Sequence, residues 1–575
     1  MKSPSEVPVT REGWWIVVAL LTFLILGNLF VIGFVHQERY LYFWDYVGYW
    51  SKFDFLSHNI LERSLYTLSV VLKSIREDDY NYFPSFLLMP SGLLFGTDRI
   101  VYILSIVNIF AFPAVILLLQ LYQKVARMYG LANPRLALIA AAMVLLLPNF
   151  WNPILIGLPD VGGFLLIQII LWLYLSGPYA QQSCRNLLLM ALLIPTMVLF
   201  RRWYAYWGVS FYAVVFIIEC GSMLVLRQWT AKAFFRICLT LLAQGAISFG
   251  FLLTVARTFM SRAVHTNYAD IYSAFRKSAS MGQSCQQVVT TFGWFYLSLF
   301  AVGAILALVN TKTRKIAAFL LLQGLIIFVI FSRTQNFAPQ HFYLIMTPLL
   351  LFSALWAALL LSRATPWRIG LGLALMMLLI LNSLAMFYPN TLTKASPFVD
   401  ILTGVEYGPH VRDDIPEIDR LLSVLEQFVT DPRARIYVLS ASQTMNSHIL
   451  TYAFLSLHRH EKIGEQVLWT HDVDKRDGFP QELLTAQYLV AADPIQANLS
   501  PKDQQILSIP ARLVLKGEGI GSAFSRLPYE FHLDGDVKAY IYKKTRPFTE
   551  AELDTLSGLL RDLYPDRPFI YEIKR

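Results

Sequence analysis

Long apolar stretches dominate the first two thirds of the chain and decide which fold classes are open to it. A helix that crosses a bilayer needs ~20 mostly apolar residues. Only 15% of the residues are charged, whereas a soluble domain is nearer ~25%. The sequence therefore predicts an α-helical polytopic membrane protein with about 11 transmembrane helices. The eleven stretches are, approximately, 13–35, 99–122, 134–150, 159–175, 186–200, 203–226, 234–256, 288–309, 317–332, 341–361 and 367–388.

The connecting loops predict how these helices are oriented. Basic loops remain on the cytoplasmic side of a membrane, and five alternate loops carry 12 Lys and Arg but no Asp or Glu: 123–135, 176–185, 227–236, 310–316 and 362–368. With the short loops, this favours a multi-pass protein of the cell inner (plasma) membrane with a cytoplasmic N-terminus. The net charge of +9 then reports orientation and gives no reason to expect a nucleic-acid partner.

The last third of the chain has a different composition. Residues 390–575 carry 21 Lys and Arg against 26 Asp and Glu, an ordinary charge density for a soluble domain. Residues 415–428 have helical apolar spacing, and three segments are typical of strands: 434–442, 486–493 and 537–544. We expect a transmembrane domain over 1–389 and a C-terminal α/β domain over 390–575, which an odd number of spans places on the periplasmic side.

The first outer loop, residues 36–98, is too long to be a simple connector. An aromatic run near its start places Trp44 and Asp45 just after the first span. Residues 64–75 have the spacing of an amphipathic helix, so we expect interfacial helices in this loop. Asp78 and Asp79 come directly after that helix. Plain alternatives are open for all three acids, as solvated loop residues, turn residues or helix caps.

Polar residues also gather at later outer loops. Asp160 ends the sequence NPILIGLPD, where the chain re-enters the membrane, and it is either a helix N-cap or a functional carboxylate. Arg201 and Arg202 lie between two apolar spans on the face that should be poor in positive charge. They either snorkel to lipid phosphates or bind one specific phosphate through their planar guanidinium groups. We favour the specific phosphate, because Tyr204 and its aromatic neighbours could pack against a lipid or sugar ring.

Two further features belong to the same face. His341 and Tyr343 mark the outer entrance of the tenth span, although a histidine there is more often structural than catalytic. The loop 257–287 is a basic patch that includes Arg262. It is either a phosphate or acceptor surface or an ordinary solvated loop.

Taken in order along the chain, these features resemble the GT-C superfamily of polytopic glycosyltransferases, particularly its bacterial aminoarabinose-transferase and protein-mannosyltransferase-like branch. The likeness rests on Asp45 after the first span, YFPSFLLMPSGLLFG at 82–96, the pair Pro159-Asp160, and QHFYLIMTP from Gln340. The sequence departs from the family pattern where Tyr46 follows Asp45, where a double proline is reduced to Pro84, and where Gln340-His341 replaces an arginine.

The resemblance implies an activity: transfer of a sugar from a polyprenyl-phosphate donor to an acceptor hydroxyl on the periplasmic side, by inverting single displacement. The acceptor would be a glycan, a lipid or a protein. A base must take the hydroxyl proton and cations must hold the departing lipid phosphate. We assign catalysis to Asp45 (the base), Asp79 and Asp78; donor phosphate binding to Arg201, Arg202 and His341; and substrate binding to Asp160, Tyr204, Tyr343 and Trp44.

We predict no metal ligands, because arginine alone can hold a lipid monophosphate, although the acids are compatible with a divalent cation. Two other functions stay open: a transporter or flippase for a lipid-linked glycan, and a glycan polymer ligase. Ion-coupled transport would need ionisable residues in mid-span, and few exist; Glu219 lies near a cytoplasmic end.

Overall fold

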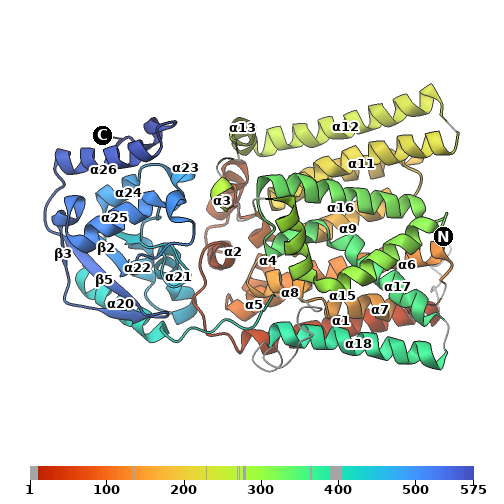
Figure 1. Ribbon diagram of the computed structural model, residues 1–575, viewed down its shortest axis with the longest axis horizontal. Coiled ribbons are helices and arrows are strands. Elements are labelled where there is room, and N and C mark those ends of the chain that lie inside the picture. Colours follow the sequence, from red (N-terminus) through yellow and green to blue (C-terminus); the bar gives the residue numbers. More distant parts are fainter. Residues whose placement is uncertain are drawn as a thin grey trace. The chain divides into compact units, whose positions relative to one another are not determined.

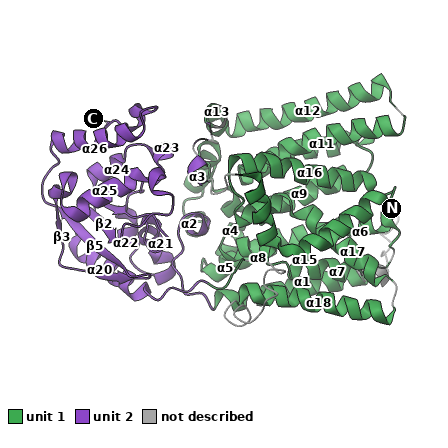
Figure 2. Ribbon diagram, in the orientation of Figure 1, with its two compact units in different colours: residues 1–36, 52–266, 278–409 green, residues 37–51, 267–277, 410–575 purple. Residues whose placement is uncertain are grey.

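The computed structural model describes residues 11–131, 133, 136–227, 229–267, 270, 272–275, 280–362, 365–388 and 405–574 (Figure 1). The chain divides into two compact units (Figure 2). Unit 1 comprises residues 1–36, 52–266 and 278–409, and unit 2 comprises 37–51, 267–277 and 410–575. The predicted domain boundary at residues 389 and 390 lies outside the described residues. Two segments from loops of the apolar region therefore pack with the C-terminal part of the chain.

Unit 1 is built almost entirely of helices. Seven described helical segments are long and apolar enough to cross a membrane: α1 (Arg11–Val35), the continuous α5 (Arg99–Ser105), η1 (Ile106–Ala111) and α6 (Phe112–Tyr129), then α11 (Tyr204–Val225), α12 (Ala231–Val255), α15 (Met281–Val309), α16 (Arg314–Thr334) and α18 (Pro366–Phe387). An eighth is counted if α7 (Leu136–Leu145) and α8 (Pro148–Leu155), which are bent by 48°, form one broken span. The prediction of a polytopic helical membrane protein is confirmed.

The other predicted stretches fall on shorter apolar helices: α9 (Val161–Tyr174), α10 (Cys184–Phe200) and α17 (Met346–Leu361). Proline explains part of this shortening, because it removes a backbone donor and ends or bends a helix. Smaller elements complete the described part of unit 1 and its loops: α3 (Ser64–Glu77), α4 (Phe83–Phe95), η2 (Tyr179–Gln181), α13 (Arg257–His265) and η4 (Pro339–Leu344), with α2 (Asp45–Asn59) shared between the units.

Helix α3 has the two faces that its sequence predicts. Thr67 and Val71 are buried, whereas Leu65 and Leu72 on the opposite face are 84% and 66% exposed. This apolar face, on a helix with basic residues, is typical of a helix that lies in a membrane interface. Its placement in an interface stays a prediction.

Unit 2 contains a five-stranded mixed sheet. Its strands are β1 (Ile436–Leu439), β2 (Tyr488–Asp493), β3 (Phe524–Arg526), β4 (Phe531–Leu533) and β5 (Val537–Lys544). The order is β1-β2-β5-β3, and β4 also pairs with β5. Strand β1 is parallel to β2, and β5 is antiparallel to its three partners. The predicted C-terminal α/β architecture is confirmed.

Helices cover both faces of this sheet. Successive strand residues point to opposite faces, so Val438 packs with one apolar core and Leu439 with the other. The first core includes α20 (Ile415–Phe428) and Leu41 from segment 37–51; the second includes α25 (Gln505–Lys516) and α26 (Glu550–Leu563). The remaining short helices are α21 (Ser447–Leu457), α22 (Glu461–Gln466), α23 (Asp474–Asp477), α24 (Gln481–Thr485), η3 (Tyr272–Phe275), η6 (Pro501–Asp503), η7 (Gly519–Ala523) and η8 (Pro568–Tyr571).

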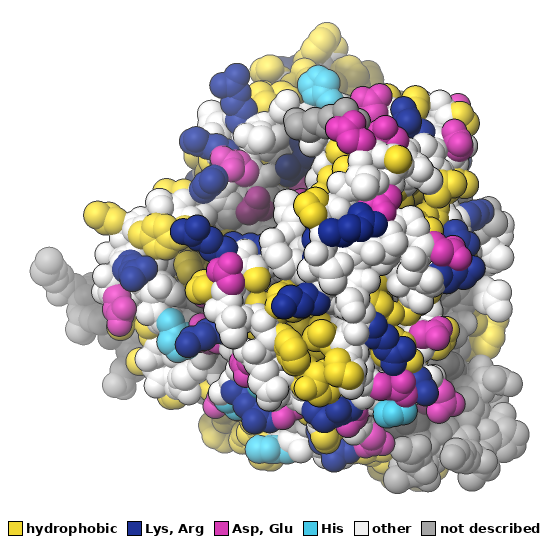
Figure 3. Space-filling view, turned by 90° about the vertical axis from the view of Figure 1, so that its left-hand side faces the viewer, with side chains coloured by type: hydrophobic (Ala, Val, Ile, Leu, Met, Phe, Trp, Pro, Cys, Tyr) yellow, Lys and Arg dark blue, Asp and Glu magenta, His cyan; other side chains and the backbone are white. Residues whose placement is uncertain are grey.

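The surface of unit 2 differs from that of the helices in unit 1. Figure 3 shows basic and acidic side chains interspersed over the face that lies at the left of Figure 1. By contrast, α12 exposes large apolar side chains such as Leu239 and Leu242, which are 70% and 71% exposed. Unit 2 thus has the surface of a water-exposed domain, and unit 1 has the surface of a domain that lipid surrounds.

Candidate functional site

A buried, irregular segment of unit 1 joins α7 to α9. Every residue from 147 to 164 is buried, although α8 in this stretch is far shorter than a membrane span. The local sequence explains the irregularity: Pro148 forces Leu147 into an extended conformation and opens α8,. Gly157 has φ +93°, a left-handed conformation that glycine adopts easily,. Pro159 and Asp160 then lead into α9. We call residues 147–160 the buried segment.

Side-chain donors from other helices satisfy the backbone carbonyls of the buried segment. Buried carbonyl groups outside a regular helix need such partners. Four hydrogen bonds reach it: Tyr343 Oη to Phe150 O at 2.5 Å, Arg99 Nη2 to Leu155 O at 2.6 Å, Tyr102 Oη to Gly157 O at 2.8 Å, and Tyr204 Oη to Asp160 O at 2.6 Å. The segment is therefore held from end to end, and Asp160 at its end is held with it.

Asp160 forms a buried ion pair with Arg201. The Arg201 Nε atom lies 3.3 Å from Asp160 Oδ1, and the two side chains are 1% and 0% exposed. The Arg201 guanidinium also lies 3.8 Å from the centre of the Trp203 ring. A buried carboxylate is strongly destabilising unless a cation accompanies it. Within the described chain, Asp160 makes no side-chain capping hydrogen bond to α9, so the N-cap alternative does not account for it.

The burial of Arg201 also excludes lipid snorkelling, because a snorkelling guanidinium must reach the lipid phosphates.

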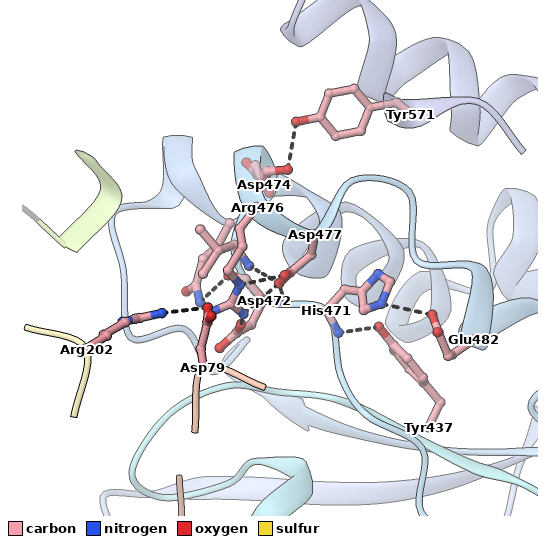
Figure 4. A network of polar contacts seen from close by, with 12 residues as sticks. Asp79, Arg202, Tyr437, His471, Asp472, Asp474, Arg476, Asp477, Glu482 and Tyr571 are labelled. Atoms are coloured by element: carbon pink, nitrogen blue, oxygen red, sulfur yellow. Dashed lines mark hydrogen bonds and ion pairs between the residues drawn. The ribbon is translucent and has the colours of Figure 1, made fainter. Parts of the chain in front are cut away.

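The neighbouring residue, Arg202, makes different contacts. The Arg202 Nη1 atom lies 2.7 Å from Asp79 Oδ2, a contact visible in Figure 4, and its Nη2 atom lies 3.2 Å from the Tyr80 hydroxyl. The Arg202 side chain is 16% exposed, so solvent reaches this pair.

Asp79 joins Arg202 to a second guanidinium, that of Arg262 on α13. The Arg262 Nη2 atom lies 2.8 Å from Asp79 Oδ1 and 2.6 Å from the Glu77 carbonyl oxygen. Asp79 is 24% exposed and Arg262 is 43% exposed. We call Asp79, Arg202 and Arg262 the arginine clamp. It holds one carboxylate between two planar cationic groups, an arrangement that also suits a phosphate.

Asp78 precedes the clamp and lies at the C-terminal end of α3, where its backbone N–H donates to Ser74 O. Burial raises the pKa of the Asp78 carboxyl, and the Lys52 ammonium opposes that rise. Asp78 therefore combines the helix-end position expected of one member of the pair with a perturbed acidity.

His341 is buried in η4, the short helix that directly precedes α17. Its Nδ1 atom accepts a hydrogen bond from Ala338 N at 3.0 Å, and its ring meets the edge of Trp203. An Nδ1 atom that accepts a hydrogen bond carries no proton, so the imidazole is neutral in this arrangement,. Its predicted part in phosphate binding would therefore need a neutral hydrogen bond.

The structure separates the remaining predicted residues. Tyr204 and Tyr343 are fully buried, and both hydroxyl groups are used by the buried segment. Trp44 and Asp45 belong to segment 37–51 of unit 2, where Asp45 opens α2. Trp44 has φ +49°, a strained conformation for a bulky residue. This strained residue directly precedes Asp45, the predicted base.

No group of three or more His, Cys, Asp and Glu residues suited to a metal ion occurs in the part of the chain that the structure describes. Sequence reasoning missed the pairing of Asp79 with Arg262, although it did note the basic patch that contains Arg262. It also missed Arg99 and Tyr102. No local signal identified those two, because their role depends on a contact with a segment more than 50 positions away.

The fold and these ion pairs define a polytopic membrane protein with a buried carboxylate–guanidinium centre beside a solvent-accessible arginine clamp. The sequence matches no protein-family model and no curated protein. Solved structures do match. ArnT from Cupriavidus metallidurans bound to undecaprenyl phosphate aligns with a TM-score of 0.51 at 13% identity, covering 92% of this chain and 98% of that chain.

The apo structure of the same ArnT gives a TM-score of 0.51 at 13% identity, covering 92% of this chain and 97% of that chain. The oligosaccharyltransferase AglB from Archaeoglobus fulgidus, in complex with an inhibitory peptide and a dolichol-phosphate, gives a TM-score of 0.48 at 11% identity, with 84% and 70% covered. The predicted resemblance to GT-C glycosyltransferases is thus confirmed at the level of the fold by ArnT.

Proposed function

We propose that the chain is an integral-membrane glycosyltransferase that moves a sugar from a polyprenyl-phosphate donor to an acceptor hydroxyl. The observation that carries the proposal is the arginine clamp. It places two guanidinium groups around one anionic group in a fold shared with ArnT, which has been solved with undecaprenyl phosphate. In this proposal Asp79 occupies the place of the donor phosphate until substrate arrives.

The clamp suits the chemistry of the leaving group. Departure of a lipid phosphate develops negative charge, and preorganised cations lower the barrier to that step. Guanidinium groups are planar, always charged and able to donate two parallel hydrogen bonds to phosphate. Arg202 and Arg262 would take the phosphate. Arg201, paired with Asp160, would act next to it without touching bulk solvent.

Attack on the sugar needs a base for the acceptor proton, and we assign that role to Asp45. The strained backbone at Trp44 supports the assignment, since strain of this kind concentrates at functional sites. The reaction would be a single displacement with inversion, and Asp78 and Asp160 would orient the acceptor. The basic loops favour the periplasmic face for this chemistry.

Binding of undecaprenyl phosphate by the purified protein in lipid nanodiscs tests the clamp. We expect saturable binding that weakens about ten-fold or more for each charged hydrogen bond lost in Arg202→Gln and Arg262→Gln. Arg185→Gln is the matched control, because Arg185 is exposed in a predicted cytoplasmic loop. Equal binding by all three variants and the wild type would remove the clamp from the proposal.

A further inference from the structure

Two residues of one turn, Arg201 and Tyr204, contact Asp160 at its carboxylate and at its backbone carbonyl. Arg201 pairs with the carboxylate through its Nε atom. Three residues later, the Tyr204 hydroxyl donates to the backbone carbonyl of Asp160 at 2.6 Å. The turn is itself closed by a hydrogen bond from Tyr204 N to Arg201 O at 3.0 Å. Side chain and backbone of Asp160 are thus fixed by a single rigid unit.

The Tyr204 ring has a fitted place against α9. Tyr204 is fully buried, and a Cβ atom added to Gly163 would lie 2.1 Å from Tyr204 Cε2. The Asp160 carbonyl also accepts hydrogen bonds from Gly163 N at 2.9 Å and Phe164 N at 3.3 Å. The Tyr204 hydroxyl therefore adds a third donor at the atom where the first turn of α9 begins.

We propose that Tyr204 is a positioning residue that directs the Asp160 carboxylate, and that it does not contact substrate. The inference rests on the proposed glycosyl transfer, in which Asp160 orients the acceptor. Without the hydroxyl, the Asp160 carbonyl would lose one of its three donors, and the residue that carries the carboxylate would be held less firmly. Misplacement of a reacting group by ~1 Å can cost about a hundred-fold in rate, whereas donor affinity is set by the arginine clamp.

The test compares Tyr204→Phe with Tyr122→Phe. Each substitution removes one hydroxyl from a buried ring, but the Tyr122 hydroxyl has no hydrogen-bond partner among the described residues. With radiolabelled polyprenyl-phosphate sugar as donor, we expect Tyr204→Phe to lower kcat about ten- to hundred-fold and to leave the donor KM within about two-fold. Tyr122→Phe should behave as the wild type. A change in KM alone, or equal kcat for the two variants, would overturn the proposal.

A double-mutant cycle with Asp160→Asn separates positioning from a general loss of structure. If Tyr204 acts through the Asp160 carboxylate, Tyr204→Phe should cost nothing further in the Asp160→Asn background. Full additivity of the two losses would contradict that route. Thermal midpoints of all variants show whether any of them fails to fold.

Hydrogen exchange gives a readout that needs no activity. Tyr204→Phe should speed exchange of the amides in the first turn of α9, especially Gly163 and Phe164, and Tyr122→Phe should not. Unchanged exchange in Tyr204→Phe would overturn the positioning role. Faster exchange in a protein that transfers no sugar would instead leave the positioning role intact and contradict the glycosyltransferase assignment.

Discussion

The role of Asp79 in unit 1 depends on the residues that contact it. Asp79 is predicted from the sequence to be catalytic, yet its carboxylate lies between the guanidinium groups of Arg202 and Arg262. A carboxylate in that place competes with an incoming phosphate. If Asp79 competes with phosphate, its substitution should strengthen phosphate binding. If Asp79 supports the clamp, the same substitution should weaken it.

Asp79→Asn should tighten the binding of undecaprenyl phosphate. The change removes the competing anion from between the two guanidinium groups, so we expect a gain of about ten-fold at low salt that shrinks at high salt. Binding in nanodiscs at two ionic strengths measures it. Weaker binding would show that Asp79 supports the clamp when phosphate is bound.

Gly163→Ala should destabilise the protein, because the added methyl group collides with the Tyr204 ring. Overpacking of this kind costs about 1–3 kcal/mol. Gly245→Ala on α12 is the matched control, since nothing lies within 4 Å of an added Cβ there. Denaturant titration of the two variants measures this difference. Equal stability would mean that the Tyr204 ring can move aside without cost.

At the residue scale, the sequence predicts which residue types gather on one face, but not how they pair. The arginines at 201 and 202 look alike in sequence, and both oppose the orientation rule. One is 1% exposed against Asp160, and the other is 16% exposed against Asp79. Contacts that join residues more than 40 positions apart decide the difference, and no local pattern encodes them.

At the scale of elements, one polar contact joins two apolar spans. The amide groups of Asn28 on α1 and Asn108 on the π-helix η1 bond to each other at 3.1 and 2.9 Å. Each also donates to a carbonyl one turn earlier in its own helix. This amide pair ties together the spans on either side of the first outer loop.

Replacing both asparagines by leucine should cost less than the two single replacements together. Each single change leaves one amide without its partner in an apolar setting, whereas the double change leaves none. Such interhelical bonds contribute about 0.6 kcal/mol on average and up to about 1.7 kcal/mol. A double-mutant cycle of unfolding free energies measures the coupling, and strictly additive losses would contradict it.

In unit 2, the loop around α23 has a carboxyl group that couples stability to pH. Burial raises the pKa of Asp472 to about 6; Arg476 opposes the rise and Asp477 adds to it. Figure 4 shows these three residues in contact. The unfolded carboxyl has a pKa of about 3.9, so the folded state binds this proton more tightly. The stabilisation is complete below about pH 4 and is lost as pH rises through 6.

Asp472→Asn should remove this dependence, which amounts to about 3 kcal/mol across that range. Hydrogen exchange of peptides covering 470–480, compared between variant and wild type at each pH, cancels the intrinsic pH effect. The wild-type loop should lose protection relative to the variant between pH 4.5 and 7. A constant difference across that range would contradict the raised pKa.

The sequence predicts elements best where one pattern is long and regular. Helix α20 and strand β5 have the bounds that apolar periodicity predicts, 415–428 and 537–544. Strands β3 and β4 have only three residues each. A segment this short shows no alternating pattern from which a strand could be predicted. The buried segment 147–160 also escapes prediction, because its carbonyls depend on donors from distant helices.

At the scale of the whole molecule, the sequence is sufficient for the fold class and for the likeness to ArnT, because apolar length and charge asymmetry are global properties. It does not show that segments 37–51 and 267–277 pack with the C-terminal part of the chain. That packing involves the predicted base, Asp45, which lies in the first of these segments.

Transfer of radiolabelled sugar from a polyprenyl-phosphate donor, by purified wild-type protein and by Asp45→Asn, tests the central claim most directly. We predict that the wild type releases polyprenyl phosphate and labels an acceptor hydroxyl. Asp45→Asn should keep its thermal midpoint and its affinity for undecaprenyl phosphate but lose transfer. Transfer at the wild-type rate by Asp45→Asn would remove the proposed base, and movement of intact donor across proteoliposomes without cleavage would contradict the glycosyltransferase assignment itself.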